Sequence, residues 1–592
     1  MLLAFSLIIG VAAAAPSPPS TLRVDAAIDG LFRYFGTSGG FIKSCGATGG
    51  NGGASRFECK CQTASHPPFC TNCWRWWMAG SMQSLVELNA AVSDHPSRNA
   101  TLQLLDDAFK TSPFTTRYNP SWAYIDDYLW YTLLWLRVHQ LHGAADTKYL
   151  DEAAATFDLM YEWGGDDTVG DCGGIFWMYP DNDEHGARKN AITTLEATSA
   201  AAQLALAYQK TDAARSEGYA ARALQLWDWT NTSGLLSATP LVQDNVSAAT
   251  GDGGSFLCCN GTSAGEGPYG QAARCAVRGS GATTWSYNQG MLLGAATDMH
   301  ALTGDGAYLA LAARVLEATA AHMTRPPSAA PAAAPAPAPA PPSSSSDSDA
   351  SASSSDDATA AAPTAAAAAA AATAAVGVLT EPVALPPIDA GLKCDAAHDP
   401  SAPIGGDAFS FKMVYFVQLP RFVAAVAAVA NNATSSATGS GTSSGTGSGT
   451  GSGTGSIIGS RGGRAGGRSG ASRGVGGSGA AFPAAAAAAT LATARALVSA
   501  SSDAAWASRV QPPFSAQRDV CHEPAPLAPA RAGAPPKFTW DWAPPPQTFC
   551  TDGRTQASAM ALFVSELLVG RTLSEWAGGA VRPGALVEAA LV

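Results

Sequence analysis

Two adjacent carboxylates, Asp126 and Asp127, stand in an aromatic stretch of the sequence that reads SWAYIDDYLW. When both are charged they repel each other, and large aromatic side chains solvate such charges poorly. The pair has two interpretations: it favours a helix N-terminus through the helix dipole, or it forms half of an active site. Another pair, Asp106 and Asp107, has no aromatic neighbours, so adjacency alone does not decide between the two.

Glycoside hydrolysis is the reaction that such a pair suits. It commonly uses one carboxylate as nucleophile and one carboxylic acid as proton donor, and retaining enzymes hold the two about 5–5.5 Å apart. Neighbouring residues reach this separation if the backbone splays their side chains. Because two close carboxyl groups do not easily ionise together, one pKa rises and that group stays protonated near the working pH. The residues alone do not say which group takes which part.

Three further segments concentrate polar and aromatic groups where a helix is expected to begin: WRWW at 74–77, GGIFW at 173–177 followed by RKNAI at 188–192, and TWSYNQG at 284–290. The candidates for stacking against sugar rings are Trp76, Trp77, Trp122, Tyr124 and Trp130. The candidates for hydrogen bonds to sugar hydroxyls are Lys189, Asn190, Tyr287, Asn288 and Gln289. Core packing is the stronger interpretation for any single Trp, because Trp is highly buried on average. Helix-start polarity explains Lys189 and Asn190 equally well.

The motifs resemble those of glycoside hydrolase family 76, the α-1,6-mannanases and their fungal wall-remodelling relatives. The resemblance rests on the Asp pair leading into a Trp-rich helix, on GGIFW followed by KNAI, and on WSYNQG running into LLGA and LTGDGAYL. It covers residues 25–325 and 376–430, and thinly 490–570. It implies an (α/α)6 barrel and a retaining endo-hydrolase of α-1,6-linked mannan. By the family's pattern, Asp126 aligns with the nucleophile and Asp127 with the acid/base.

The spacing of apolar residues independently predicts an all-α fold. Apolar side chains recur every three or four positions in 149–163, 192–208, 285–302 and 308–323, and strand-like alternation is almost absent. Short links join such helices into αα-hairpins. An open solenoid would show a fixed repeat period, which the sequence lacks. A closed ring of hairpins therefore fits better, with its loops supplying a pocket.

Composition divides the chain into packed and low-complexity parts. We predict a signal peptide at 1–15, the main part of the barrel at 22–325, a Pro/Ala/Ser insertion at 326–375, a barrel continuation at 376–432, a Gly/Ser/Thr insertion at 433–480, and a C-terminal hairpin with a tail at 481–592. The two insertions contain too few large apolar side chains to offset the entropy lost on ordering them.

Several features predict export. The chain begins with a short apolar run followed by small residues, which is typical of a secretory signal, although no Lys or Arg precedes it. In an oxidising compartment the 12 Cys would pair as disulfides. The cluster from Cys45 to Cys73 has irregular spacing, so zinc is the minor interpretation there. Glycosylation sequons occur at Asn99, Asn231, Asn245, Asn260 and Asn432. We expect a secreted glycoprotein without a transmembrane segment or lipid anchor, because no second apolar run is evident near the C-terminus.

Other functions fare less well. The formal net charge of −12 argues against a nucleic-acid partner. No His-Glu-x-x-His motif or phosphate-binding Gly-Lys-Ser/Thr loop occurs, and the nine His are scattered. We therefore expect no metal and no cofactor, a monomer, and α-mannan or a related polysaccharide as partner.

Three alternatives stay open. A cell-wall transglycosidase of the same family would carry the same motifs, and none of them separates transfer from hydrolysis. A non-catalytic glycan-binding barrel would have kept the pocket, but the intact Asp126–Asp127 pair argues against it. A solenoid scaffold for a protein partner would show the repeat period that is missing.

Overall fold

The computed structural model of the chain describes residues 18–37, 40–41, 76–112, 114, 124–143, 146–164, 173–178, 188–247, 283–326, 376–381, 408–438, 482–509, 518–519, 536, 538, 548–549 and 553–577. The helices are α1 (Ser20–Phe35), α2 (Trp76–Ala91), α3 (Arg98–Thr111), α4 (Ile125–His142), α5 (Lys148–Gly164), α6 (Ala191–Tyr208), α7 (Ala213–Thr232), α8 (Ser286–Thr303), α9 (Gly306–His322), α11 (Ala408–Thr438), α12 (Ala484–Ala507) and α13 (Gly553–Ala577). The strands are short: β1 (Gly36–Thr37), β2 (Gly40–Phe41), β3 (Arg188–Asn190), β4 (Asn245–Ser247), β5 (Thr324–Arg325), β6 (Val378–Leu379), β7 (Arg518–Asp519) and β8 (Thr548–Phe549). Within the described ranges they form four two-stranded pairs, and of these four only β7–β8 is parallel.

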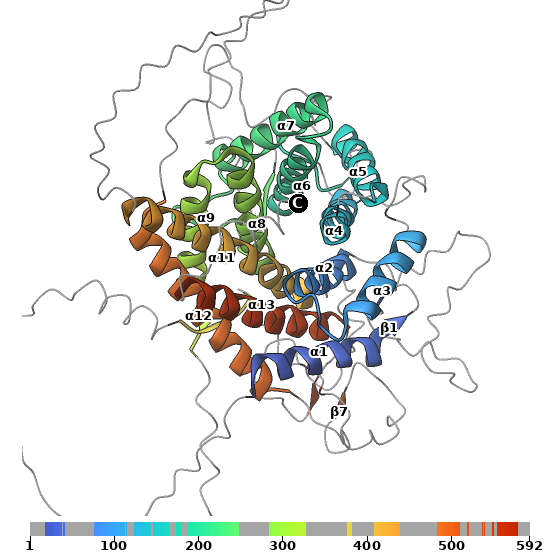
Figure 1. Cartoon of the computed structure of the whole chain (residues 1–592), viewed down its shortest axis with the longest axis vertical. Helices are drawn as coiled ribbons and strands as arrows, with labels where there is room; N and C mark the ends of the chain where they lie inside the picture. The colour runs from blue at the N-terminus through green and yellow to red at the C-terminus, as the bar shows by residue number, and fades with distance from the viewer. Residues whose placement is uncertain are drawn as a thin grey trace, which may run out of the picture.

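Six helices form a closed inner ring. Each of α2, α4, α6, α8, α11 and α13 packs against the next, and α13 packs against α2 (Figure 1). The outer layer follows the same order, with α3 against α2, α5 against α4, α7 against α6, α9 against α8, α12 against α11 and α13, and α1 against α13. The predicted all-α (α/α)6 barrel of six helical hairpins is therefore confirmed.

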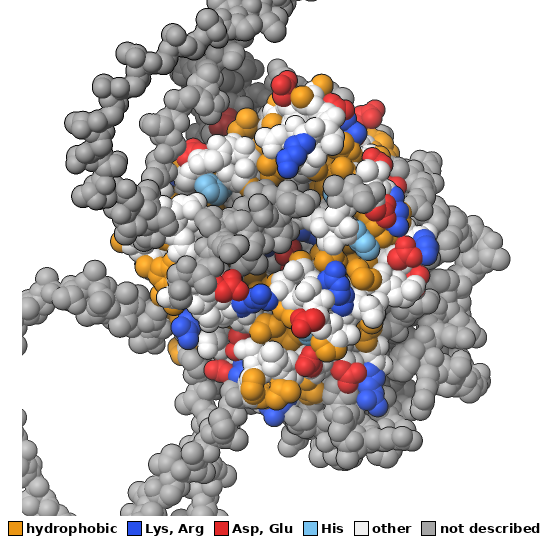
Figure 2. Space-filling view, viewed as in Figure 1, with side chains coloured by type: hydrophobic (Ala, Val, Ile, Leu, Met, Phe, Trp, Pro, Cys, Tyr) orange, Lys and Arg blue, Asp and Glu red, His pale blue; other side chains and the backbone are white. Residues whose placement is uncertain are grey.

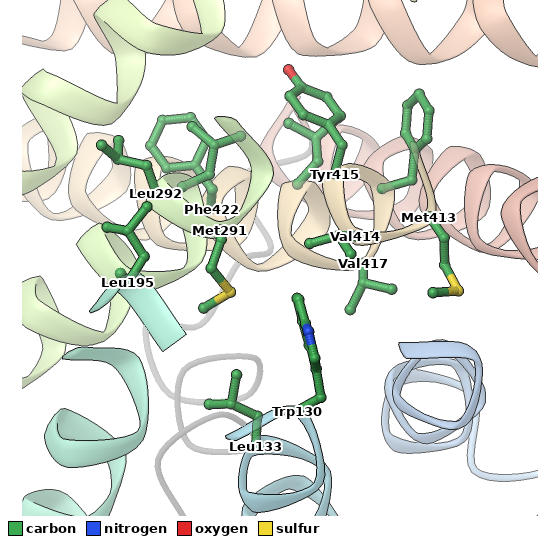
Figure 3. Close-up of a cluster of buried hydrophobic side chains, with 14 of the residues drawn as sticks. Trp130, Leu133, Leu195, Met291, Leu292, Met413, Val414, Tyr415, Val417 and Phe422 are labelled. Carbon is green, nitrogen blue, oxygen red and sulfur yellow. The ribbon is translucent and has the colours of Figure 1, made fainter. Parts of the chain in front are cut away.

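Inner and outer helices differ in sequence because they differ in burial. In α6, sixteen of the eighteen residues are buried, so this helix is apolar or small on every face. In the outer helix α7, burial is confined to one stripe: Tyr219, Ala223, Leu226, Trp227, Trp229 and Thr230. Between the inner helices the core is continuous. Figure 3 shows Trp130 and Leu133 of α4 pointing toward Met291 of α8 and Val417 of α11.

Two glycines let α8 and α11 approach closely. A Cβ on Gly290 would lie 2.3 Å from the Cα of Tyr415, and one on Gly294 would lie 2.4 Å from Oε1 of Gln418. The first obstacle is backbone and cannot rotate away, so the two helices would have to separate.

We expect Gly290→Ala to lower the free energy of unfolding by about 1–3 kcal/mol, the usual cost of overpacking. Gly218→Ala is the matched control: Gly218 lies inside α7, and a Cβ there would meet nothing within 4 Å. This control should stabilise the protein by up to about 1 kcal/mol, because Ala favours a helix more than Gly does. Denaturant unfolding of both variants measures the difference. Equal effects would mean that the α8–α11 contact is not tight.

A buried charge cluster joins the inner helices away from their first turns. Asp298 of α8 accepts hydrogen bonds from Arg421 of α11 and from Ser199 of α6, and its Oδ2 also accepts from Nε2 of Gln203 (3.0 Å). Arg137 of α4 lies 3.9 Å from the same carboxylate. Burial raises the pKa of Asp298 to about 6, although Arg137 and these hydrogen bonds lower it.

The chain returns to the barrel through β6 after the first predicted insertion. β6 pairs antiparallel with β5, so Arg325 stands opposite Val378. The following residue, Thr380, donates its N–H to the carbonyl of Met323 (2.8 Å). Glu381 then caps α8: its Oε2 accepts from the N–H of Ser286 (3.0 Å), and its Oε1 accepts from the Ser286 hydroxyl. The segment 378–381 is thus held against β5 and in turn holds the first residue of the inner helix α8.

The predicted domain boundaries stay predictions. α11 continues to Thr438, past the predicted boundary at 432. The signal peptide at 1–15 and all 12 Cys lie outside the described residues. Of the sequon residues, Asn99, Asn231 and Asn432 are exposed, and Asn245 is 6% exposed. On the face shown in Figure 2, Lys and Arg side chains are interspersed with Asp and Glu.

Among the described residues, three helices are long and apolar enough to cross a membrane, judged by length and composition alone. The stretches are Ser410–Asn432, Ala484–Ala507 and Arg554–Ala577, in α11, α12 and α13. From the sequence we expected no second apolar run near the C-terminus and therefore missed these three stretches. In this structure, 89% of the Ser410–Asn432 window and 72% of the Arg554–Ala577 window are buried, because both belong to the inner ring.

Candidate active site

The first turns of the inner helices meet at one end of the barrel. Phe411, near the start of α11, contacts Trp76 at the start of α2, with ring centroids 6.0 Å apart. It also stacks on Tyr287 at the start of α8, with centroids 4.1 Å apart. Asp126 lies in the first turn of α4. Helix dipoles put positive potential at this end, which favours negative side chains here.

The GGIFW segment crosses this end and is tied to three helices. The N–H of Ile175 donates to Thr194 Oγ1 of α6 (3.1 Å), and the N–H of Phe176 donates to the last residue of α5. The carbonyl of Trp177 accepts from the N–H of Ile125, the first residue of α4 (2.9 Å). Trp177 is therefore fixed beside the start of the helix that carries the Asp pair.

The two glycines of this segment are needed for its conformation. Gly173 and Gly174 have φ of 69° and 74°, a region that favours glycine. Trp229 of α7 lies where their Cβ atoms would be, 2.8 Å and 2.6 Å away. The sequence motif thus has a structural reason, which is to place Trp177.

Both carboxylate oxygens of Asp126 accept hydrogen bonds. Oδ2 accepts from Nε1 of Trp177 (3.0 Å), and Oδ1 accepts from the N–H of Asp127 (3.1 Å). Asp126 is partly exposed, whereas Asp127 is 5% exposed. Two N–H donors favour the ionised form of Asp126.

Burial and proximity act against that ionised form. Burial, and then the negative charge of Asp127, raises the pKa of Asp126 well above its ordinary 3.8, while the bonds from Trp177 and the backbone lower it. Such a pair loses its protons in two steps that belong to both groups. A pair that shares one proton is in the state that acid–nucleophile chemistry requires.

Asp244 is a third carboxylate at this end. It precedes β4, and its Oδ1 accepts from the Tyr287 hydroxyl (2.8 Å) and from Nδ2 of Asn288 (3.1 Å). Burial, followed by the charge of Asp244, raises the pKa of Tyr287; Asp126 and Glu196 also contribute. Two of the predicted sugar-contacting residues therefore lie in one polar cluster near the Asp pair.

The other predicted polar residues have structural partners. Nζ of Lys189 donates to the carbonyl of Gly173 (2.5 Å). Asn190 is the N-cap of α6 and accepts from the N–H of Thr193 (3.2 Å). Gln289 is fully buried, and its amide exchanges two hydrogen bonds with the backbone of Val242 (2.7 and 2.8 Å). Helix-start polarity explains Asn190, and Gln289 anchors a loop.

The predicted aromatic platforms fall into two groups. Trp76, Trp77 and Trp130 are at most 8% exposed and pack in the barrel core, as the core interpretation of Trp expects. Trp76 and Trp130 contact each other, with ring centroids 5.6 Å apart. Tyr124 is partly exposed and packs against Trp177, with centroids 4.9 Å apart. Trp122 lies outside the described residues. Tyr124 is therefore the aromatic candidate best placed for a ligand.

Sequence reasoning missed three residues of the site. Trp177 belongs to a recognised motif but was given no role, and Asp244 stands in a loop without a distinctive pattern. Glu196 had a usable signal: it is the only charged residue in α6, whose sequence is AITTLEATSAAAQLALAY. Burying a carboxyl group in a helix without a partner costs free energy, so a lone Glu in such a helix indicates a function.

Residues 55–334 match the family model described as glycosyl hydrolase family 76. The chain carries a glycosyl hydrolase family 76 domain. The match spans α2 to α9 and includes the Asp pair, Trp177, Glu196, Asp244 and Tyr287. No curated protein sequence matches the chain.

Solved structures similar to this chain share little sequence with it. One is an inactive variant of an α-1,6-mannanase of Salegentibacter sp. in complex with α-1,6-mannotriose, at 15% identity over 93% of this chain and 100% of that one, with a TM-score of 0.46. Another is Dfg5 from Chaetomium thermophilum in complex with glucosamine, at 14% identity over 84% of this chain and 80% of that one, with a TM-score of 0.41.

Proposed function

We propose that this family 76 glycoside hydrolase cleaves α-1,6-linked mannan by a retaining double displacement, with Asp126 as nucleophile and Asp127 as acid/base. The observation that carries the proposal is the hydrogen bonding of Asp126, whose two oxygens accept from Trp177 and from the N–H of Asp127 (3.0 and 3.1 Å). Those donors stabilise the carboxylate on Asp126. These bonds oppose the burial and the Asp127 charge that raise the pKa of Asp126. In the proposed mechanism Asp126 is ionised and Asp127 holds the shared proton, which a leaving group can receive.

The reaction then proceeds in two balanced steps. In the first, Asp126 attacks the anomeric carbon while the bond to the leaving oxygen breaks, and Asp127 gives its proton to that oxygen. In the second, Asp127 takes a proton from water, whose oxygen attacks the same carbon and releases Asp126. Two inversions at one carbon retain the configuration. The cluster of Asp244, Tyr287 and Asn288 supplies groups that can bind sugar hydroxyls.

The choice of α-1,6-mannan rests on the family 76 domain and on the motifs that resemble α-1,6-mannanases. The test is to incubate the purified full chain with linear α-1,6-mannan, and separately with α-1,2- and α-1,3-linked mannans. Product configuration is followed by NMR in the first minutes. We expect shorter α-1,6-oligosaccharides with the α configuration. Products of β configuration would overturn the retaining mechanism, lengthened chains would indicate transfer in place of hydrolysis, and cleavage of other linkages alone would overturn the substrate.

Trp177→Phe tests the donor to Asp126 directly. Phe retains an aromatic ring beside Tyr124 but has no N–H, and this hydrogen bond lowers the pKa of Asp126. Its loss raises that pKa, so the acidic limb of the kcat/KM profile should move to higher pH. We expect kcat/KM to fall by about 10- to 100-fold, the value of a hydrogen bond to a charged group. Trp227→Phe on α7 is the control and should leave the profile in place; an unmoved limb in Trp177→Phe would contradict the role of this bond.

We also propose that the protein is exported through the secretory pathway. The apolar run at 1–15 supports this proposal. The exposed sequon residues Asn99, Asn231 and Asn432 support it as well, since a glycan needs a surface position.

A further inference from the structure

Glu196 is a buried carboxyl group without a hydrogen-bond partner. It lies in the second turn of α6 and is 0% exposed. Among the described residues, neither of its carboxyl oxygens has a hydrogen-bond partner. Most buried polar side-chain atoms are hydrogen-bonded, so an exception calls for an explanation.

The groups that face Glu196 are mostly acids. From α4 these are Asp126 and Asp127, whose negative charges act directly on it. Tyr287 of α8 is in electrostatic contact with both Glu196 and Asp126. Lys189, just before α6, is turned to the carbonyl of Gly173 and lies over the Phe176 ring (4.6 Å).

These surroundings disfavour a charge on Glu196. Burial, and then the charges of Asp126 and Asp127, raises the pKa of Glu196 well above its ordinary 4.5, and no cation of the described residues offsets them. A charged Glu196 would add a second negative charge, fully buried, beside the single charge of the Asp pair. A protonated Glu196 instead presents an O–H dipole and an acceptor oxygen.

We propose that Glu196 is a neutral positioning residue of the Asp126–Asp127 pair, one that keeps its proton throughout the reaction and stabilises the single negative charge of the pair through its O–H dipole. It acts through the pair, because full burial keeps it from touching a sugar. This inference rests on the proposed hydrolase function and adds a third carboxyl group to the same site.

The first test compares Glu196→Gln with Glu196→Leu by their pH profiles of kcat and kcat/KM on α-1,6-mannan. Gln keeps the shape, the neutral charge and an N–H dipole, so its profile should superimpose on that of the parent. Leu removes the dipole, so its acidic limb should move to higher pH by about one unit and its kcat should fall by about 10-fold, the effect of one pKa unit of lost charge stabilisation. Glu152→Gln on α5, where the carboxylate accepts from Thr156 Oγ1 (3.2 Å), is a control outside the site.

Two outcomes of this test would overturn the inference. If Glu196 were charged, Gln would remove a negative charge and both limbs would move to lower pH. If Leu left the limbs in place, Glu196 would only fill space.

A second test needs no substrate. An acid with a raised pKa in the folded state binds a proton there that the unfolded state has lost. Between pH 4.5 and that raised pKa, the stability of the parent therefore falls as pH rises. Relative to Glu196→Gln, the unfolding constant of the parent should increase by about tenfold per pH unit. A ratio that stays constant from pH 5 to pH 7 would overturn the inference.

The two tests separate the inference from the proposed function. A parent that is inactive on mannan but shows the pH-dependent stability ratio would refute the function and leave a neutral Glu196. An active parent without that ratio would refute the inference and leave the function standing.

Discussion

Asp126→Asn and Asp127→Asn should each abolish most of the activity on α-1,6-mannan while leaving the fold intact. Asn has nearly the shape of Asp but neither attacks an anomeric carbon nor donates an acidic proton. We expect Asp127→Asn to lose about 10²- to 10⁴-fold in kcat, the usual contribution of general acid–base catalysis. Asp126→Asn should lose at least as much, because no covalent intermediate then forms. Initial rates measure the loss, and circular dichroism checks the fold.

The chain supplies its own control for these variants. Asp106 and Asp107 form the same dipeptide on α3, away from the first turns of the inner ring. Asp106 there pairs with Lys110. Asp107→Asn should therefore retain full activity. Equal activity in all three variants would refute the site.

The roles within the pair can be separated with azide and the Ala variants. If Asp126 is the nucleophile, azide occupies the space left in Asp126→Ala and displaces the leaving group once, giving an inverted glycosyl azide. If Asp127 is the acid/base, azide attacks the covalent intermediate of Asp127→Ala and gives a retained glycosyl azide. The opposite pair of products would exchange the two assignments.

Asp298→Asn should change how stability depends on pH by about 3 kcal/mol. The pKa of Asp298 is raised from 3.8 to about 6, because burial outweighs Arg137 and the hydrogen bonds from Ser199 and Gln203. The folded state therefore holds a proton that the unfolded state loses above pH 3.8. The parent becomes less stable as pH rises from 4 to 6, by about 1.4 kcal/mol per pH unit. Asn does not titrate, so the variant lacks this decline.

The measurement is the unfolding free energy of both proteins at pH 4, 5, 6 and 7. The difference between them removes the titration of distant groups, and any constant cost of leaving Arg421 and Arg137 without a counter-charge cancels across pH. Asp158→Asn, which removes an exposed partner of Arg222 (2.6 Å), is the control. A pH-independent difference would show that Asp298 is ionised at pH 4.

The sequence predicted the barrel because helix formation is local. Spacings of three and four apolar residues are visible in α6, α8 and α9, and short links force consecutive helices into hairpins. The roles of the aromatic residues were less accessible. The inner helices are buried on all faces, so the pattern around Trp130 does not distinguish a core residue from a cleft residue. Its 2% exposure follows from the ring that α4 joins.

The Asp pair could be singled out as a candidate from the sequence because its two residues are adjacent. Its supporting groups come from other helices: Trp177 is 51 residues away from Asp126, and their contact depends on how the GGIFW segment is tied across α4, α5 and α6. Asp244 likewise meets Tyr287 only because the loop before β4 returns to α8, 43 residues further along the chain. Such contacts form only when distant parts of the chain pack together, so no local pattern in the sequence indicates them.

The pairing of β5 with β6 holds together the two points where the chain leaves the barrel and returns to it. Arg325 and Val378 stand opposite each other, and Glu381 caps α8. Closing a flexible loop costs only about 0.6 kcal/mol more for each doubling of its length. A longer or shorter connection between β5 and β6 would therefore cost little, so this strand pair is a suitable place for inserting a domain by protein engineering.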